Sequence, residues 1–279
     1  MSAQLMDGKA LAAQKKAAIR AEVERLARTP GLAVVLVGEN PASQIYVRGK
    51  ARDCEECGIR CMDFRLPAQT TESELLTLIA ELNGRADVDG ILVQLPLPDG
   101  IRERRVLEAI APEKDVDAFH PENVGRLVQG QARYLPCTPA GVMELLRAAG
   151  VDPAGRRAVI VGRSNIVGKP MALLLLQADA TVTVCHSRTP DLADECRQAD
   201  ILISAVGRRG LITADMIKPG AAVVDVAMNR DEDGKLCGDV DFAAACAVAA
   251  HITPVPGGVG PMTRAMLMEN TLRAARLRD

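Results

Sequence analysis

Short aliphatic runs alternate with helical stretches along the whole chain, and this alternation constrains the fold more than any other feature of the sequence. A run of β-branched and leucine residues bounded by Gly, Pro or polar residues is typical of a buried strand in a parallel sheet. Strands that alternate with helices form stacked βα units, so the chain is predicted to belong to the α/β class. The predicted strands are residues 32–37, 91–95, 158–161, 181–185, 201–205 and 222–226.

Helical patterns lie at both ends of the chain, at residues 9–28 and 262–278. Between them, a first seam at residues 136–155 holds a predicted helix at 140–149 that ends in a Gly and a Pro. A second seam is rich in Gly and Pro. We predict that residues 253–261 are not helical and that Pro261 takes the first position of the final helix.

These two segments are predicted domain boundaries, so the chain is expected to form two domains. An N-terminal α/β domain covers residues 1–138, and the C-terminal helix at 262–279 returns to it. Residues 139–261 form the second domain, whose four βα-like units have the size of a nucleotide-binding half of a doubly wound sheet.

Composition excludes two classes of partner. The 279 residues include 34 Lys and Arg against 36 Asp and Glu, with three Phe, two Tyr and no Trp. A nucleic-acid surface needs positive charge and aromatic faces, so we expect no nucleic-acid partner.

The longest apolar stretch, 242–250, is too short for a membrane span, and the N-terminus lacks a signal-peptide pattern. We therefore expect no membrane association and a cytoplasmic location.

A glycine-containing loop joins a predicted strand to the helix predicted at 171–177. Backbone N–H groups at such a helix start can hold a pyrophosphate. Gly162 and Gly168 are six residues apart, and Ser164 stands where the usual fingerprint has its middle glycine, so an ordinary βα turn remains an alternative. The candidate cofactor-binding residues of this loop are Gly162, Arg163, Ser164, Ile166, Val167 and Gly168.

The end of the next strand favours NADP over NAD. An NAD site usually has Asp or Glu there for the ribose hydroxyl, whereas this chain has Ser187 and Arg188. Together with Arg163, these residues could bind a 2′-phosphate. The alternative is that both arginines are ordinary solvated surface residues.

Three further polar groups are candidates for chemistry. Tyr46 and Lys50 are four residues apart and share one face of a predicted helix, where a partly desolvated phenol and ammonium could form an acid/base pair. A surface pair without function is the alternative.

Gln94 ends a predicted strand at the sheet edge where α/β proteins bind ligands. Asp115 and Asp117 lie in a non-helical turn and suit a cationic ligand edge better than a metal, because no further ligand follows at a metal-like spacing.

Five segments occur together in the order and spacing of one family: 46–50, 94–98, 112–117, 162–170 and 254–263. On these motifs, which span nearly the whole chain, the sequence resembles the bifunctional methylenetetrahydrofolate dehydrogenase/methenyltetrahydrofolate cyclohydrolase family. The resemblance implies an N-terminal α/β substrate domain, a Rossmann-like NADP-binding domain, an active-site cleft between them and a homodimer. It implies NADP-dependent oxidation of 5,10-methylenetetrahydrofolate and hydrolysis of the methenyl product to 10-formyltetrahydrofolate, a one-carbon donor for purine biosynthesis.

The resemblance also assigns roles. Lys50 matches the catalytic lysine, and Tyr46 and Gln94 match the residues that flank it and contact substrate. Asp117 matches the acid that binds the pterin. Pro256, Gly257 and Gly258 border the ligands, and Arg163, Ser164 and Ser187 lie on the cofactor side. No metal is implied.

Two positions depart from the family pattern. Ala118 stands where the family usually has Gly, and Ala227-Met228 stand where it has Gly-Ile. Each change adds side-chain bulk that could narrow the pocket or shift a backbone that prefers positive φ.

Other functions remain as alternatives: a dehydrogenase-only homologue, a generic Rossmann oxidoreductase, or a metal or redox protein built on Cys54, Cys57 and Cys61. The retained set of Tyr46, Lys50, Gln94 and Asp117 argues against the first two. The cysteines lack a fourth ligand at a zinc-like spacing, which argues against the third.

Overall fold

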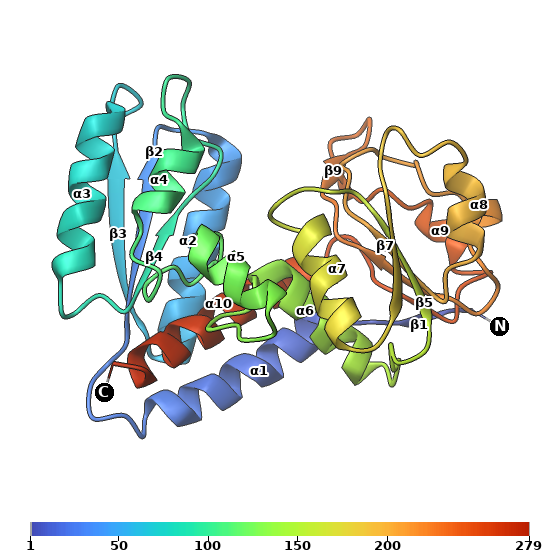
Figure 1. The fold of residues 1–279 in the computed structure, drawn as a ribbon, viewed down its shortest axis with the longest axis horizontal. Coiled ribbons are helices and arrows are strands. Elements are labelled where there is room, and N and C mark those ends of the chain that lie inside the picture. Colours follow the sequence, from blue (N-terminus) through green and yellow to red (C-terminus); the bar gives the residue numbers. More distant parts are fainter. Residues whose placement is uncertain (1, 279) are drawn as a thin grey trace. The chain divides into compact units, whose positions relative to one another are not determined.

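The computed structural model describes residues 2–278, which divide into two compact units. The three-stranded unit comprises residues 13–135 and 264–278, and the six-stranded unit comprises residues 2–12 and 136–263. Two helices contribute residues to both units: α1 (Gly8–Val23) and α10 (Val259–Arg276). Figure 1 colours them at the blue and red ends of the chain.

The three-stranded unit is built on a parallel sheet with strand order β3-β2-β4. Every residue of the central strand β2 is buried. Figure 1 shows α2 and α3 on opposite sides of this sheet. Because side chains alternate along a strand, Ala33, Val35 and Val37 pack into the cluster that contains α3 and α4. The elements are β2 (Gly31–Val37), α2 (Pro41–Cys57), β3 (Arg60–Leu66), α3 (Glu72–Gly84), β4 (Gly90–Val93), α4 (Glu103–Ala109) and α5 (Pro121–Val128).

The six-stranded unit has an all-parallel sheet with strand order β1-β11-β8-β7-β5-β6. The chain direction across the sheet reverses at β5, since β6 lies on one side of it and β7 on the other. Ligands of open α/β sheets bind at the carboxyl ends of strands at such a switch point. The main elements are β1 (Gln4–Leu5), α6 (Cys137–Ala148), β5 (Arg157–Val161), α7 (Gly168–Gln177), β6 (Thr181–Cys185), α8 (Leu192–Arg197), β7 (Ile201–Ser204), β8 (Ala222–Asp225) and β11 (His251–Ile252).

Short elements complete this unit. They are the 3-10 helix η1 (Ala214–Met216), the antiparallel pair β9 (Asn229–Arg230) and β10 (Leu236–Cys237), and α9 (Phe242–Ala245). No helix within residues 2–278 is long and apolar enough to cross a bilayer.

The α/β class and the six predicted strands are confirmed: 181–185 has its predicted bounds, and the other five shift by one or two residues at their ends. The first helix stops at Val23 rather than at residue 28. The final helix begins at Val259, so the prediction that residues 253–261 contain no helix is wrong at 259–261. Pro261 is tolerated there because the first turn of a helix has no intrahelical partner for its N–H groups.

Candidate active site

Lys50 and Gln94 meet in the three-stranded unit. Lys50 lies on α2, and Gln94 directly follows β4. The Lys50 Nζ donates a hydrogen bond of 2.8 Å to the Gln94 Oε1. Gln94 is fixed in turn, because its backbone N–H donates to the Val35 carbonyl at 2.8 Å and its Nε2 donates to the Leu95 carbonyl at 2.7 Å. The structure thus brings together a lysine and an amide that are 44 residues apart in sequence.

Tyr46 lies one turn before Lys50 on the same helix, and it is 37% exposed. Burial raises the pKa of the Tyr46 phenol, and the positive charge of Arg264 acts in the opposite direction. The phenol is therefore the protonated form at neutral pH, in which it can donate a hydrogen bond.

The two neighbouring acids of the 112–120 turn have different environments. Asp115 is 1% exposed, and its Oδ2 accepts from the His120 N–H at 2.8 Å and from the Asn123 Nδ2 at 2.9 Å. Burial raises the pKa of Asp115. Asp115 therefore holds the turn together, whereas Asp117 is only half-buried.

Ala118, next to Asp117, adopts φ 60° and is buried. This is the left-handed region that favours glycine, so the expected preference for positive φ at this position is confirmed. Alanine keeps the backbone conformation, at a cost in strain. Ala227 does not share this conformation. Within residues 2–278, the residues other than glycine that have positive φ are Ala118 and Asp179. Ala227 is buried and Met228 is 45% exposed.

The loop after β5 has the geometry of an anion site. The Ser164 Oγ accepts from the Val167 N–H at 3.1 Å and lies 3.4 Å from the Gly168 N. A Cβ at Gly168 would overlap the Gly162 carbonyl, and one at Gly162 would lie 2.6 Å from the Ala205 carbonyl oxygen. The two glycines thus allow the loop to close tightly over the start of α7. This cradle fits a dinucleotide phosphate.

Ser187 and Arg188 belong to a turn beside that loop. Val161 of β5 pairs with Cys185 of β6, and the Gly162 N–H donates to the Cys185 carbonyl at 2.9 Å. The Arg188 N–H donates to the His186 Nδ1 at 3.1 Å, which closes the turn. Residues 163, 187 and 188 are all exposed. Two guanidinium groups and a hydroxyl are therefore exposed at the ends of two neighbouring strands, and these are the groups that bind phosphates in proteins.

The loop of Pro256, Gly257 and Gly258 packs on the start of α1. The Lys9 N–H donates to the Gly257 carbonyl at 2.9 Å, and a Cβ at Gly8 would overlap the Gly258 carbonyl. Gly257 has φ 111°. No pattern in the sequence linked Gly8 with this loop.

Asp239 is a residue that sequence reasoning missed. It is fully buried, and it accepts from the Ser204 Oγ at 2.8 Å, the Val206 N–H at 2.9 Å and the Asn229 Nδ2 at 3.0 Å. It therefore fixes the loop after β7, next to the switch point. A single Asp between Gly238 and Val240 carries no recognisable signal.

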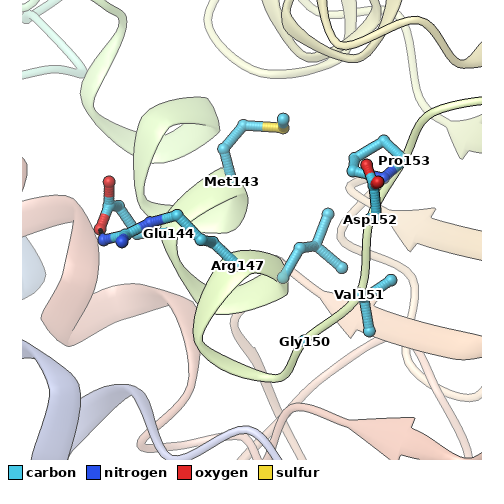
Figure 2. A pocket seen from close by; sticks show the side chains of 8 residues that line it. Met143, Glu144, Arg147, Gly150, Val151, Asp152 and Pro153 are labelled. Carbon is cyan, nitrogen blue, oxygen red and sulfur yellow. Dashed lines mark hydrogen bonds and ion pairs between the residues drawn. The ribbon is translucent and has the colours of Figure 1, made fainter.

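Two hollows lie in the six-stranded unit. One of about 470 Å³ is lined by residues that include Asp225, Phe242, Pro254 and Val255, near the 256–258 loop. The other, of about 410 Å³, lies at the end of α6. Figure 2 shows its lining, with Met143 and Val151 on either side and the Arg147 and Glu144 side chains together. It contains none of the predicted site residues.

The cysteines are free thiols. Cys54 and Cys57 lie on α2 and Cys61 on β3. A hydrogen bond with Cys61 and burial raise the pKa of Cys54, and burial raises that of Cys57 to about 12. Within residues 2–278, no three His, Cys, Asp or Glu side chains are grouped so that they could hold a metal ion. These thiols are suited to packing rather than to metal binding.

Comparisons with known proteins agree with this geometry. Residues 6–117 match the family model of the tetrahydrofolate dehydrogenase/cyclohydrolase catalytic domain, and residues 136–279 match the model of its NAD(P)-binding domain. The chain is 62% identical over 279 residues to the bifunctional protein FolD of Moorella thermoacetica, which covers 99% of this chain and 100% of the relative.

Solved structures give the same result. The bifunctional FolD methylenetetrahydrofolate dehydrogenase/cyclohydrolase of Campylobacter jejuni superposes with a TM-score of 0.98 at 53% identity over 100% of both chains. The Trypanosoma brucei dehydrogenase-cyclohydrolase, solved with NADP cofactor and an inhibitor, gives a TM-score of 0.95 at 43% identity over 99% of this chain and 98% of that one.

Proposed function

Because this chain belongs to the tetrahydrofolate dehydrogenase/cyclohydrolase family, we infer that it is a bifunctional enzyme of folate one-carbon interconversion. It oxidises 5,10-methylenetetrahydrofolate to the methenyl cation with NADP and hydrolyses that cation to 10-formyltetrahydrofolate. The observation that carries this function is the family match over both units, together with the hydrogen-bonded pair of Lys50 and Gln94.

We propose that the phosphate loop and the turn after β6 hold NADP. Gly162, Ser164, Ile166, Val167 and Gly168 form the loop at the start of α7, where backbone N–H groups can face the pyrophosphate. Arg163, Ser187 and Arg188 would bind the 2′-phosphate. When bound, NADP supplies the acceptor for the hydride of the methylene carbon.

The N-terminal folate domain is proposed to cover residues 1–138 with 262–279, and the NADP domain residues 139–261. Residues 2–12 nevertheless pack in the six-stranded unit, where β1 pairs with β11. In the first, Asp117 would accept hydrogen bonds from the pterin ring. Pro256, Gly257 and Gly258 would border the substrate.

Lys50 would move the proton of the hydrolytic step. Water that adds to the cationic methenyl carbon must lose a proton, and the departing nitrogen must gain one. A cation beside Lys50 disfavours a second positive charge, so the substrate itself favours the neutral amine. Gln94 orients that amine through their 2.8 Å hydrogen bond, and Tyr46 presents a phenol on the same helical face.

We further propose a homodimer in the cytoplasm with no nucleic-acid partner. The net charge of −2 supports the last point. Sedimentation velocity would test the first, with twice the 29.7 kDa chain mass as the expected result.

An absorbance time course tests the two activities. Purified protein is mixed with methylenetetrahydrofolate and NADP, and reduced cofactor and methenyl product are followed separately, with NAD and no-enzyme controls. We expect reduced cofactor together with methenyl decay faster than the control. Reduced cofactor with methenyl decay at the control rate would indicate a dehydrogenase alone, and no reduced cofactor with either nucleotide would contradict the function.

Lys50→Met should abolish methenyl hydrolysis while folate still binds, because methionine carries no proton to exchange. Lys50→Arg is the matched control, since it keeps the positive charge but stays protonated at all working pH values. We expect both variants to lose at least about 100-fold in hydrolysis, the usual size of an acid/base contribution. Normal hydrolysis in either variant would contradict the proton-transfer role.

A further inference from the structure

Arg264 of α10 is held by a buried acid on α2. Its Nε lies 2.9 Å from the Asp53 Oδ2, and the Asp53 side chain is 3% exposed. The other oxygen of Asp53 lies 2.7 Å from the Lys16 Nζ. Arg264 itself remains 34% exposed. The guanidinium is thus ion-paired at one edge while part of it faces solvent.

A glycine makes room for this guanidinium. A Cβ built at Gly49 would overlap the Arg264 Nη1, so the guanidinium lies directly against the backbone of α2 at the residue before Lys50. Its charge also acts on the Tyr46 phenol. Arg264 therefore borders the face of α2 that carries both proposed site residues.

Helix α10 carries both Arg264 and a residue that contacts the backbone next to Asp117, the proposed pterin-binding acid. The Asn270 Nδ2 donates to the Val116 carbonyl at 2.8 Å, directly before Asp117. Arg264 lies six residues earlier on α10, about 9 Å along the helix axis at 1.5 Å per residue. In the proposed pose, with the pterin at Asp117 and the one-carbon unit at Lys50, the p-aminobenzoyl-glutamate side would continue beyond the one-carbon unit, away from Asp117. Arg264 lies against Gly49, the residue next to Lys50. The glutamate end of that side carries carboxylates.

We propose that Arg264 is a specificity-determining residue that binds a carboxylate of the glutamate tail of the substrate. The inference rests on the proposed folate function and deepens it. A guanidinium held in one orientation loses little freedom on binding and matches a carboxylate in geometry and charge. The substrates it favours are tetrahydrofolates that carry one or more glutamates, over the tail-less tetrahydropteroate.

The experiment compares three substrates in the dehydrogenase reaction: the methylene derivatives of tetrahydropteroate, tetrahydrofolate monoglutamate and tetrahydrofolate triglutamate. For Arg264→Gln we expect KM to rise about tenfold with both glutamate-bearing substrates, the size of one charged hydrogen bond at a partly exposed site. kcat and the KM for tetrahydropteroate should stay within about twofold of the wild type. Asp53 keeps Lys16 as a partner in this variant, so the fold should persist.

Two further variants sharpen the comparison. Gly49→Ala displaces the guanidinium without removing it, and alanine favours helix, so it should raise the same KM values in a well-folded protein. Arg52→Gln, an exposed cation on the same helix, is the charge-matched control and should change nothing.

An equal KM rise with tetrahydropteroate, or a fall in kcat with unchanged KM, would overturn the tail-binding role and indicate that Arg264 only shapes α2. Unchanged KM values for all three substrates in Arg264→Gln would overturn it as well. A wild-type protein that turns over none of the three substrates would instead contradict the folate function itself.

Discussion

Asp225, at the end of β8, is a buried carboxylate that is held by backbone N–H groups. It is 3% exposed, and its oxygens accept from the Ala227 N–H at 3.1 Å and the Val240 N–H at 2.8 Å. Burial raises its pKa to about 6, although these hydrogen bonds act in the opposite direction. The residue therefore couples folding to pH.

This coupling has a definite sign. Since the folded-state pKa of Asp225 exceeds its unfolded value, the folded protein binds this proton more tightly, and its contribution to the free energy of unfolding falls as pH rises from about 4 to about 6. The change is at most roughly 3 kcal/mol. Asp225→Asn should remove this part of the pH dependence. Urea unfolding of both proteins at pH 4.5 and 7 would measure it, and a difference between them that stays constant with pH would contradict the prediction.

A substitution of Arg163 tests whether the site prefers NADP over NAD. It is exposed in the phosphate loop, where it can contact a phosphate that NADP has and NAD lacks. Arg163→Ala should raise the KM for NADP about tenfold and leave the KM for NAD nearly unchanged. Steady-state dehydrogenase rates with both nucleotides measure this, and Lys169→Ala, an exposed cation at the start of α7, serves as a control. An equal effect on both nucleotides would refute the 2′-phosphate role.

At the scale of elements, the phosphate loop depends on Gly168. A methyl group there would overlap the Gly162 carbonyl, and backbone cannot yield as a flexible side chain can. Gly168→Ala should therefore open the loop, weaken NADP binding at least about tenfold and cost about 1–3 kcal/mol of stability. Isothermal titration with NADP and thermal unfolding would measure both. Gly155→Ala provides a contrast, because no atom lies near a Cβ at that glycine, and only its positive φ should cost stability.

The sequence predicted those elements whose apolar residues are continuous. β2, β5 and β8 are buried aliphatic runs, and each was found. β3 was missed because Arg60, Asp63 and Arg65 interrupt it, and its burial pattern is that of a strand with exposed positions at the edge of the sheet. The two-residue strands β1, β9, β10 and β11 are too short to leave a periodic signal.

The site was predictable only in part. The helical spacing placed Tyr46 and Lys50 on one face, whereas only the tertiary fold brings Gln94 within 2.8 Å of Lys50. The positive φ of Ala118 followed from the family pattern. Asp53, Arg264 and Asp239 had no local signal, because their partners are distant in sequence and come together only when the sheet and helices pack.

At the scale of the whole molecule, one carboxylate joins three distant parts of the three-stranded unit. Asp89 is fully buried before β4. Arg28 contacts its two oxygens at 2.8 and 2.9 Å, the Gly31 N–H donates to it at 2.9 Å, and Arg278 near the C-terminus lies at 2.8 Å. These contacts of Asp89, which we call the Asp89 clamp, fix the end of α10 to the sheet.

Removing the charge should destabilise the protein strongly, because two arginines would lose their shared partner. We expect Asp89→Asn to lower the free energy of unfolding by about 3–5 kcal/mol, the usual cost of breaking a buried ion pair. Asp87→Asn is the control: that carboxylate is exposed and its ion pairs are screened by solvent, so its loss should lower the free energy of unfolding much less. Chemical denaturation would compare them, and equal midpoints would contradict the role of the clamp.

The return of α10 to the three-stranded unit has a consequence for how the protein is made. Residues 13–135 leave the ribosome early, but the segment 264–278 that completes their unit is synthesised only after residues 136–263. The continuous stretch 136–263, by contrast, is complete before that segment is made. Domains fold as units during translation. The three-stranded unit, most of which is made before residue 136, is therefore completed after the six-stranded unit, and until residues 264–278 are made its unfinished core is the part of the nascent chain that needs protection from aggregation.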